Sequence, residues 1–134
     1  MIALKTALEM IMEEGLENRW NRHKKVAHAV HAGIESLGLD FVAEENYRAY
    51  TVTGFHVPKG KAISIQSELK SRFNVEVASG FGDMKNNALR VGHMANIGHN
   101  EVGRFLNGLE SILSEYDSTI KKGTVVNAIS QILK

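Results

Sequence analysis

Apolar residues recur at three- and four-residue intervals over the first third of the chain, a spacing that is typical of amphipathic helices. The first stripe lies within residues 2–14 and comprises Leu4, Leu8, Ile11 and Met12. After Gly15, a second and longer stripe comprises Leu16, Trp20, Ala27, Val30, Ile34 and Leu37. Gly38 follows where a glycine commonly ends a helix. The pattern predicts two successive helices, the second with a solvated basic face formed by Arg19, Arg22, Lys24 and Lys25.

The middle of the chain is richer in β-branched and aromatic residues and in alternating patterns, which favour strands. We expect a short strand at residues 41–42, a clear one at 51–57, and two more at 75–77 and 89–94. Between the second and third of these, residues 61–73 repeat apolar side chains one helical turn apart and predict another helix.

The last third of the chain is predicted to be helical. Residues 100–116 carry a broad apolar face, with Asn100 as the expected N-cap and Glu101 near the positive end of the helix dipole. A polar linker at residues 117–123 precedes a short closing helix at 124–133. The order α-α-β-β-α-β-β-α, with a helical tail, predicts an α+β two-layer sandwich in which helices pack on one face of a small antiparallel sheet.

The composition is that of an ordinary globular domain and argues against several functions. We expect one domain at residues 1–116, with residues 117–134 as its linker and C-terminal helix. A net charge of +1 gives no electrostatic case for binding nucleic acid or an anionic membrane. The chain has no cysteine, which excludes a disulfide scaffold, a thiolate metal site and a cysteine nucleophile. Because no apolar run could span a bilayer and no signal-peptide pattern is found, we expect a cytoplasmic location.

Arg90 is the strongest candidate for a binding residue. It lies on the fourth predicted strand, beside the glycine loop Ser79-Gly80-Phe81-Gly82, and it points away from the face that carries Leu89 and Val91. A guanidinium offers two parallel N–H donors and keeps its charge near neutral pH, so it is well suited to grip a carboxylate. The spacing alone fits a solvated or ion-paired surface arginine better, because most arginines are exposed.

Other combinations of polar residues are incomplete. His28 and His31 lie three residues apart on the second helix and could face one metal ion, but the sequence shows no third ligand nearby. His93 and His99 flank the turn after the last strand, where histidines are usually partly exposed polar residues.

Two further patterns carry little weight. Glu44 and Glu45 are adjacent on a loop that does not fix their geometry, and Ser67 and Lys70 have acyl-transfer spacing but no partner motif. The chain therefore offers no complete catalytic set, and Arg90 remains only as a binder.

Three segments together resemble a known family. They are EEGLENRWNRHKKVAHAVHAGIESLGL at residues 13–39, TVTGFHVPKG at 51–60 and VEVASGFGDMKNNALRVGHM at 75–94. In this order and at these separations they resemble the C-terminal domain of class V aminotransferases, in the serine–pyruvate and alanine–glyoxylate group. Some members of that group carry the label soluble hydrogenase small subunit. The EEGL run and the pentad beginning at Arg90 are the most specific parts.

The resemblance implies a fold type I enzyme that uses pyridoxal phosphate and is usually a homodimer. In such enzymes the cofactor lysine and the aspartate that pairs with the pyridine nitrogen lie in a large domain, so this chain is expected to bind no cofactor covalently. The resemblance also implies that Arg90 clamps the substrate α-carboxylate, which reverses the preference stated above. The chain departs from the family at Ala95, where glycine is usual, and at Asn87, where several members have a basic or bulky residue.

The function expected from the resemblance is that of a small domain or subunit of an aminotransferase. The complete enzyme would move an amino group between alanine or serine and glyoxylate or pyruvate, and the chain alone would be inactive. Its partner would be the large domain, in the same longer chain or in a separate subunit. The alternative is a non-enzymatic α+β module that binds a small carboxylate or a protein. An exposed first helical stripe would favour a lost or assembled interface, and a buried one would favour the module.

Overall fold

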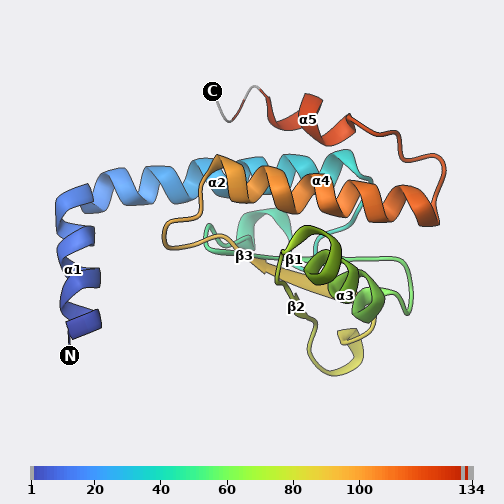
Figure 1. The fold of residues 1–134 in the computed structure, drawn as a ribbon, viewed down its shortest axis with the longest axis horizontal. Helices are drawn as coiled ribbons and strands as arrows, with labels where there is room; N and C mark the ends of the chain where they lie inside the picture. The colour runs from blue at the N-terminus through green and yellow to red at the C-terminus, as the bar shows by residue number, and fades with distance from the viewer. Residues whose placement is uncertain (1, 131, 133–134) are drawn as a thin grey trace.

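The computed structural model describes residues 2–130 and 132, which form an α+β fold with five helices and one small sheet (Figure 1). The helices are α1 (Ile2–Glu14), α2 (Leu16–Ser36), α3 (Ala62–Phe73), α4 (His99–Tyr116) and α5 (Thr124–Ile129). The strands are β1 (Val52–His56), β2 (Ala78–Ser79) and β3 (Ala88–Gly92), in the antiparallel order β1-β3-β2. The predicted fold class is confirmed. Within the described residues, no helix is both long and apolar enough to cross a membrane.

The sheet has one buried face and one open face, because successive side chains on a strand alternate. Phe55 pairs with Leu89 and Thr53 pairs with Val91, and all four side chains are buried. The opposite face carries Arg90 with small residues directly around it, and Val52 and His56 at the two ends of β1. The core therefore lies on one side of the sheet only.

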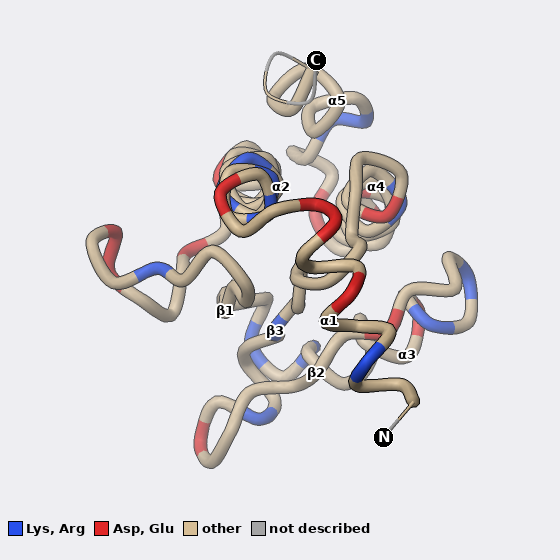
Figure 2. The backbone as a smooth tube through the Cα atoms, turned by 90° about the vertical axis from the view of Figure 1, so that its left-hand side faces the viewer, with Lys and Arg blue, Asp and Glu red and all other residues tan. Residues whose placement is uncertain are grey.

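Helices α2 and α4 lie side by side over the buried face, with α5 across them on the outside (Figures 1 and 2). Gly33 of α2 permits this packing, since a Cβ there would come within 2.4 Å of Leu106 on α4. Gly38 has a φ of 69°, and Gly38 and Leu39 donate N–H bonds to the last turn of α2. The predicted glycine ending of this helix is confirmed.

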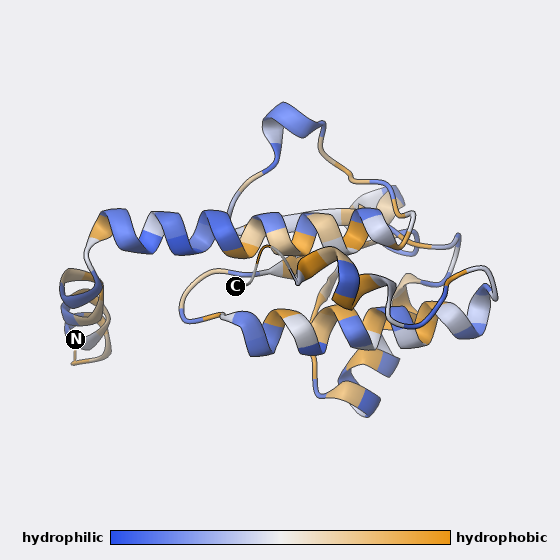
Figure 3. Cartoon of the chain, turned by 90° about the horizontal axis from the view of Figure 1, so that it is seen from above, coloured by the Kyte–Doolittle hydropathy of each residue, from blue (hydrophilic) through white to orange (hydrophobic). Residues whose placement is uncertain are grey.

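Helix α1 stands apart from this packed body (Figures 1 and 3). None of its described residues is buried, and Ile2, Leu4, Leu8, Met10 and Met12 are 45–85% exposed. Gly15, with a φ of 82°, turns the chain between α1 and α2. The first helical stripe is therefore an exposed apolar surface.

Several predicted boundaries differ from the structure. Residues 41–42 form no strand and contribute only an isolated bridge between Phe41 and Phe55. Residues 75–77 are not a strand either, because β2 begins at Ala78. Asn100 is not the N-cap of α4, which begins one residue earlier and is capped at Gly98. The closing helix ends at Ile129, and part of its predicted span, residues 131 and 133, lies outside the described residues.

Candidate functional site

Arg90 lies at the centre of the open face of the sheet, on the middle strand. Its cross-strand neighbours on that face are Gly54 of β1 and Ala78 of β2, and Gly92 follows two residues along β3. None of these three residues has a side chain larger than a methyl group. The arginine is half-buried and borders an open hollow of about 780 Å³, which is also lined by Gln66, Phe81 and Lys85. The strand pattern therefore sets Arg90 on a floor of small residues.

Two contacts fix the guanidinium of Arg90. Its Nε donates a hydrogen bond of 3.0 Å to the carbonyl oxygen of Ser79, and its Cζ lies 3.8 Å from the ring centroid of Phe81. Among the described residues, no carboxylate forms an ion pair with Arg90, and its two terminal nitrogens make no hydrogen bond. Two parallel N–H donors from Nη1 and Nη2 match the two oxygens of a carboxylate. The arrangement is therefore suited to bidentate binding of a carboxylate anion.

The histidines lie apart from this hollow. His28 is exposed and contacts the ring of Tyr50 edge-on, and His99 is exposed at the start of α4. Within the described residues, no group of three or more histidine, aspartate and glutamate side chains is arranged to hold a metal ion.

A polar network joins the half-buried His31 to the buried His93, two residues that no pattern in the sequence connects. The Oγ1 of Thr53 lies 3.1 Å from His31 Nε2 and 2.8 Å from His93 Nε2. His93 is 1% exposed, in contrast to the partly exposed residue that the sequence predicted. Burial, and secondly the charge of His31, lowers the pKa of His93 to about 4. The network of His31, Thr53 and His93 lies on the buried side of the sheet. It therefore connects α2 to the sheet and does not face the hollow around Arg90.

The remaining candidates also fail to assemble into a site. Glu44 and Glu45 are both exposed at the start of a short 3-10 turn, with no hydrogen bond or ion pair between them. Ser67 and Lys70 are exposed on α3, and Lys70 pairs with Glu76 at 3.0 Å. Neither pair lines the hollow that contains Arg90.

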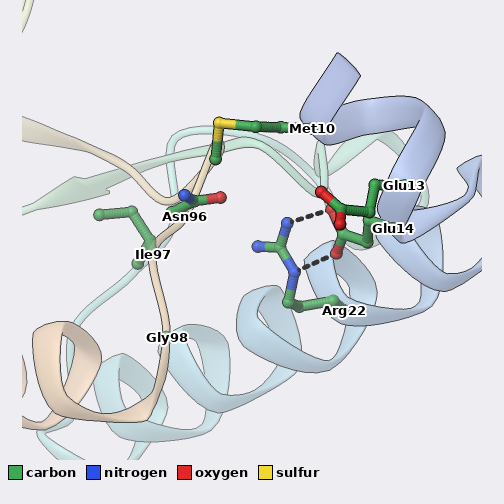
Figure 4. A pocket seen from close by; sticks show the side chains of 7 residues that line it. All are labelled: Met10, Glu13, Glu14, Arg22, Asn96, Ile97 and Gly98. Atoms are coloured by element: carbon green, nitrogen blue, oxygen red, sulfur yellow. Dashed lines mark hydrogen bonds and ion pairs between the residues drawn. The ribbon is translucent and has the colours of Figure 1, made fainter. Parts of the chain in front are cut away.

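A second hollow, of about 400 Å³, lies at the junction of α1, α2 and the loop before α4 (Figure 4). Arg22 grips Glu14 with two hydrogen bonds of 2.6 and 2.9 Å, and it also donates to the carbonyl oxygen of Ala95 at 2.6 Å. The hydrogen bond from Arg22 is the main cause that holds the pKa of Glu14 below its ordinary value. Arg19 also pairs with Glu14, so the prediction of a fully solvated basic face is wrong for Arg19 and Arg22. These contacts set the direction of α1.

Sequence comparisons show that this chain is similar to one part of several aminotransferases. No family model matches it. An uncharacterized aminotransferase of Methanocaldococcus jannaschii is 36% identical over 133 residues, which span 98% of this chain and 34% of that protein. The soluble hydrogenase small subunit of Synechococcus sp. is 34% identical over 133 residues, which again span 98% of this chain and 34% of that protein. Other relatives are named alanine–glyoxylate and serine–glyoxylate aminotransferases.

The structural comparison agrees. The crystal structure of ureidoglycine–glyoxylate aminotransferase from Bacillus subtilis matches with a TM-score of 0.85 and 30% identity. The match covers 92% of this chain and 33% of that one. The chain thus spans about a third of the length of the curated relatives it matches.

Proposed function

The chain belongs to the class V aminotransferases, whose C-terminal part it matches, and we propose that it is the small domain or subunit of such an enzyme. In this proposal the complete enzyme moves an amino group between a small amino acid, alanine or serine, and a 2-oxo acid, glyoxylate or pyruvate. Arg90 binds the carboxylate that all of these substrates share. The observation that carries this role is an arginine on an open face with its terminal nitrogens unused among the described residues.

The hollow around Arg90 suits a substrate carboxylate, but its described lining offers no desolvated lysine for a Schiff base with pyridoxal phosphate. Among the described residues that line it, Lys85 is the only primary amine, and Lys85 is exposed. A lysine that forms a Schiff base is usually activated by a desolvated pocket or a cationic neighbour. We therefore propose that the large domain holds the cofactor and that this chain alone does not transaminate. Pyridoxal phosphate would supply the electron sink of the reaction when bound there.

The exposed face of α1 supports the need for a large domain. A row of large apolar side chains at the surface commonly marks an interaction site. The chain covers only about a third of its relatives, so the remaining two thirds of such an enzyme are the natural occupant of this face. We propose that the large domain packs on α1, either within a longer chain or as a separate subunit. The complete enzyme is proposed to be a cytoplasmic homodimer, as the family resemblance implies.

The role of Arg90 is tested by binding of pyruvate to the 134-residue chain. Pyruvate should shift the Nε–H NMR signal of Arg90, whereas the uncharged analogue pyruvamide should not. Arg90→Lys should weaken pyruvate binding by at least about tenfold, because one ammonium replaces a two-donor fork. Arg104→Lys, at an exposed arginine on α4, is the matched control and should bind as the wild type does.

Two results would count against the proposal. Unchanged pyruvate affinity in Arg90→Lys would remove the carboxylate role from this residue. Formation of pyruvate from alanine by the isolated chain, supplied with pyridoxal phosphate and glyoxylate, would show that no large domain is needed.

A further inference from the structure

Phe81 lies face-on against the guanidinium of Arg90, although it belongs to a surface loop. The Arg90 Cζ is 3.8 Å from the centroid of the ring, and the Phe81 residue is 68% exposed. A cation stacked on an aromatic face is attracted by the ring quadrupole. Stacking also limits the rotation of the guanidinium plane, so the exposed ring of Phe81 restricts the orientation of the Arg90 side chain.

The loop that carries Phe81 is ordered by its own hydrogen bonds. Gly80 donates to the carbonyl oxygen of Ala88 at 2.8 Å, and Met84 donates to that of Phe81 at 3.0 Å. A Cβ at Gly80 would come within 2.5 Å of the Met84 carbonyl oxygen, so the tight turn needs a glycine there. The ring is therefore presented by a fixed turn rather than by a loose tip.

The two contacts of Arg90 together leave one edge of the guanidinium open. The Ser79 carbonyl oxygen accepts from Nε at 3.0 Å and fixes rotation within the plane, and Phe81 fixes the plane itself. The Nη1–Nη2 edge is then the edge that remains for an incoming planar anion. A long side chain that is already ordered loses less conformational freedom on binding.

We propose that Phe81 is a positioning residue, which holds the Arg90 guanidinium in the plane that receives the substrate carboxylate. The inference rests on the proposed function of Arg90. It adds Phe81 as a second residue that sets the affinity of the site for the substrate carboxylate. It predicts that the aromatic face at residue 81, and not apolar bulk alone, sets how tightly the site binds 2-oxo acids.

The test compares Phe81→Leu, which keeps apolar bulk, with Phe81→Tyr, which keeps the aromatic face. A stacked ring shields the Arg90 Nε–H proton, so Phe81→Leu should move its NMR signal downfield and Phe81→Tyr should not. Phe81→Leu should weaken pyruvate binding by about three- to tenfold, while Phe81→Tyr stays within about twofold of the wild type. Tyr47→Leu removes an exposed aromatic residue from another loop and should change neither measurement.

The outcomes separate this inference from the function on which it rests. If Phe81→Leu binds pyruvate like the wild type while Arg90→Lys loses it, Phe81 has no positioning role and the carboxylate clamp stands. If Phe81→Tyr is as weak as Phe81→Leu, the aromatic face is not the cause and the inference is overturned. If Arg90→Lys keeps full affinity, or the wild type binds no pyruvate, the proposed function fails first.

Discussion

Mild acid should destabilise this protein through His93. The residue is 1% exposed and its Nε2 lies 2.8 Å from Thr53 Oγ1, within the polar network that also contains His31. Burial, followed by the charge of His31, lowers its pKa from 6.5 to about 4. The unfolded chain therefore takes up this proton near pH 6.5, whereas the folded chain resists it until about pH 4.

The sign and size of the effect follow from linkage. A group whose folded pKa is depressed contributes stability above its unfolded pKa and loses that contribution as the pH falls through the folded value. Between pH 7.5 and 5, this shift in the pKa of His93 costs about 2 kcal/mol of the free energy of unfolding. His31, whose pKa is also lowered, mainly by burial and next by the charge of Arg48, adds in the same direction.

The assay is urea unfolding at several pH values between 7.5 and 5. The carboxylates with lowered pKa values titrate mainly below this range even in the unfolded chain, so the histidines dominate the slope. His93→Gln should remove most of the pH dependence, while His99→Gln, at an exposed histidine, should retain all of it. A His93→Gln variant as acid-sensitive as the wild type would refute the reasoning, as would a wild type that loses less than about 0.5 kcal/mol.

Two further predictions concern Ala95 and α1. Ala95 has a φ of 60°, a left-handed conformation that is costly for a residue with a Cβ. Ala95→Gly should therefore raise the free energy of unfolding by about 0.5–1 kcal/mol, after subtracting the extra entropy that glycine gives the unfolded chain. Urea denaturation measures this change, and a loss of stability would contradict the prediction. Leu8 and Met12 are 51% and 83% exposed, so Leu8→Glu with Met12→Glu should change the free energy of unfolding by less than about 1 kcal/mol but weaken binding to the large-domain polypeptide in a pull-down. A cooperative loss of fold in this double variant would instead show that α1 packs within the domain.

The long helices and the strands β1 and β3 were predictable from the sequence, but the strands expected at residues 41–42 and 75–77 were not formed. Wide apolar stripes fix α2 and α4 because these helices bury a whole face. Val75 and Val77 alternate as a strand would, but Val75 donates its N–H to Leu69 of α3, and Gln66 of α3 donates to the Val77 carbonyl oxygen. Helix α3 thus uses the backbone groups that a partner strand would need, and this long-range competition is invisible in the local pattern.

The start of α4 depends on a local contact that was missed, whereas the candidate site depends on a contact across a turn. Asn100 is a good N-cap residue, but the carboxylate of Glu101 bonds back to the N–H of Gly98 at 2.9 Å and sets the helix start earlier. Strand alternation correctly placed Arg90 on the face opposite Leu89. It could not show that Phe81 covers the guanidinium, because the turn between them decides that contact.

The composition of the open sheet face is itself an argument for close approach by another molecule. An antiparallel sheet with one solvated face normally places polar side chains there. Here the four nearest positions around Arg90 on this face are Gly54, Ala78, Ala88 and Gly92, and glycine within a strand weakens it by entropy and by the loss of packing. Such a cost is understandable where a ligand or another backbone must come close to the strand. The small residues around Arg90 thus leave the room that a substrate carboxylate and a covering domain would need under the proposed function.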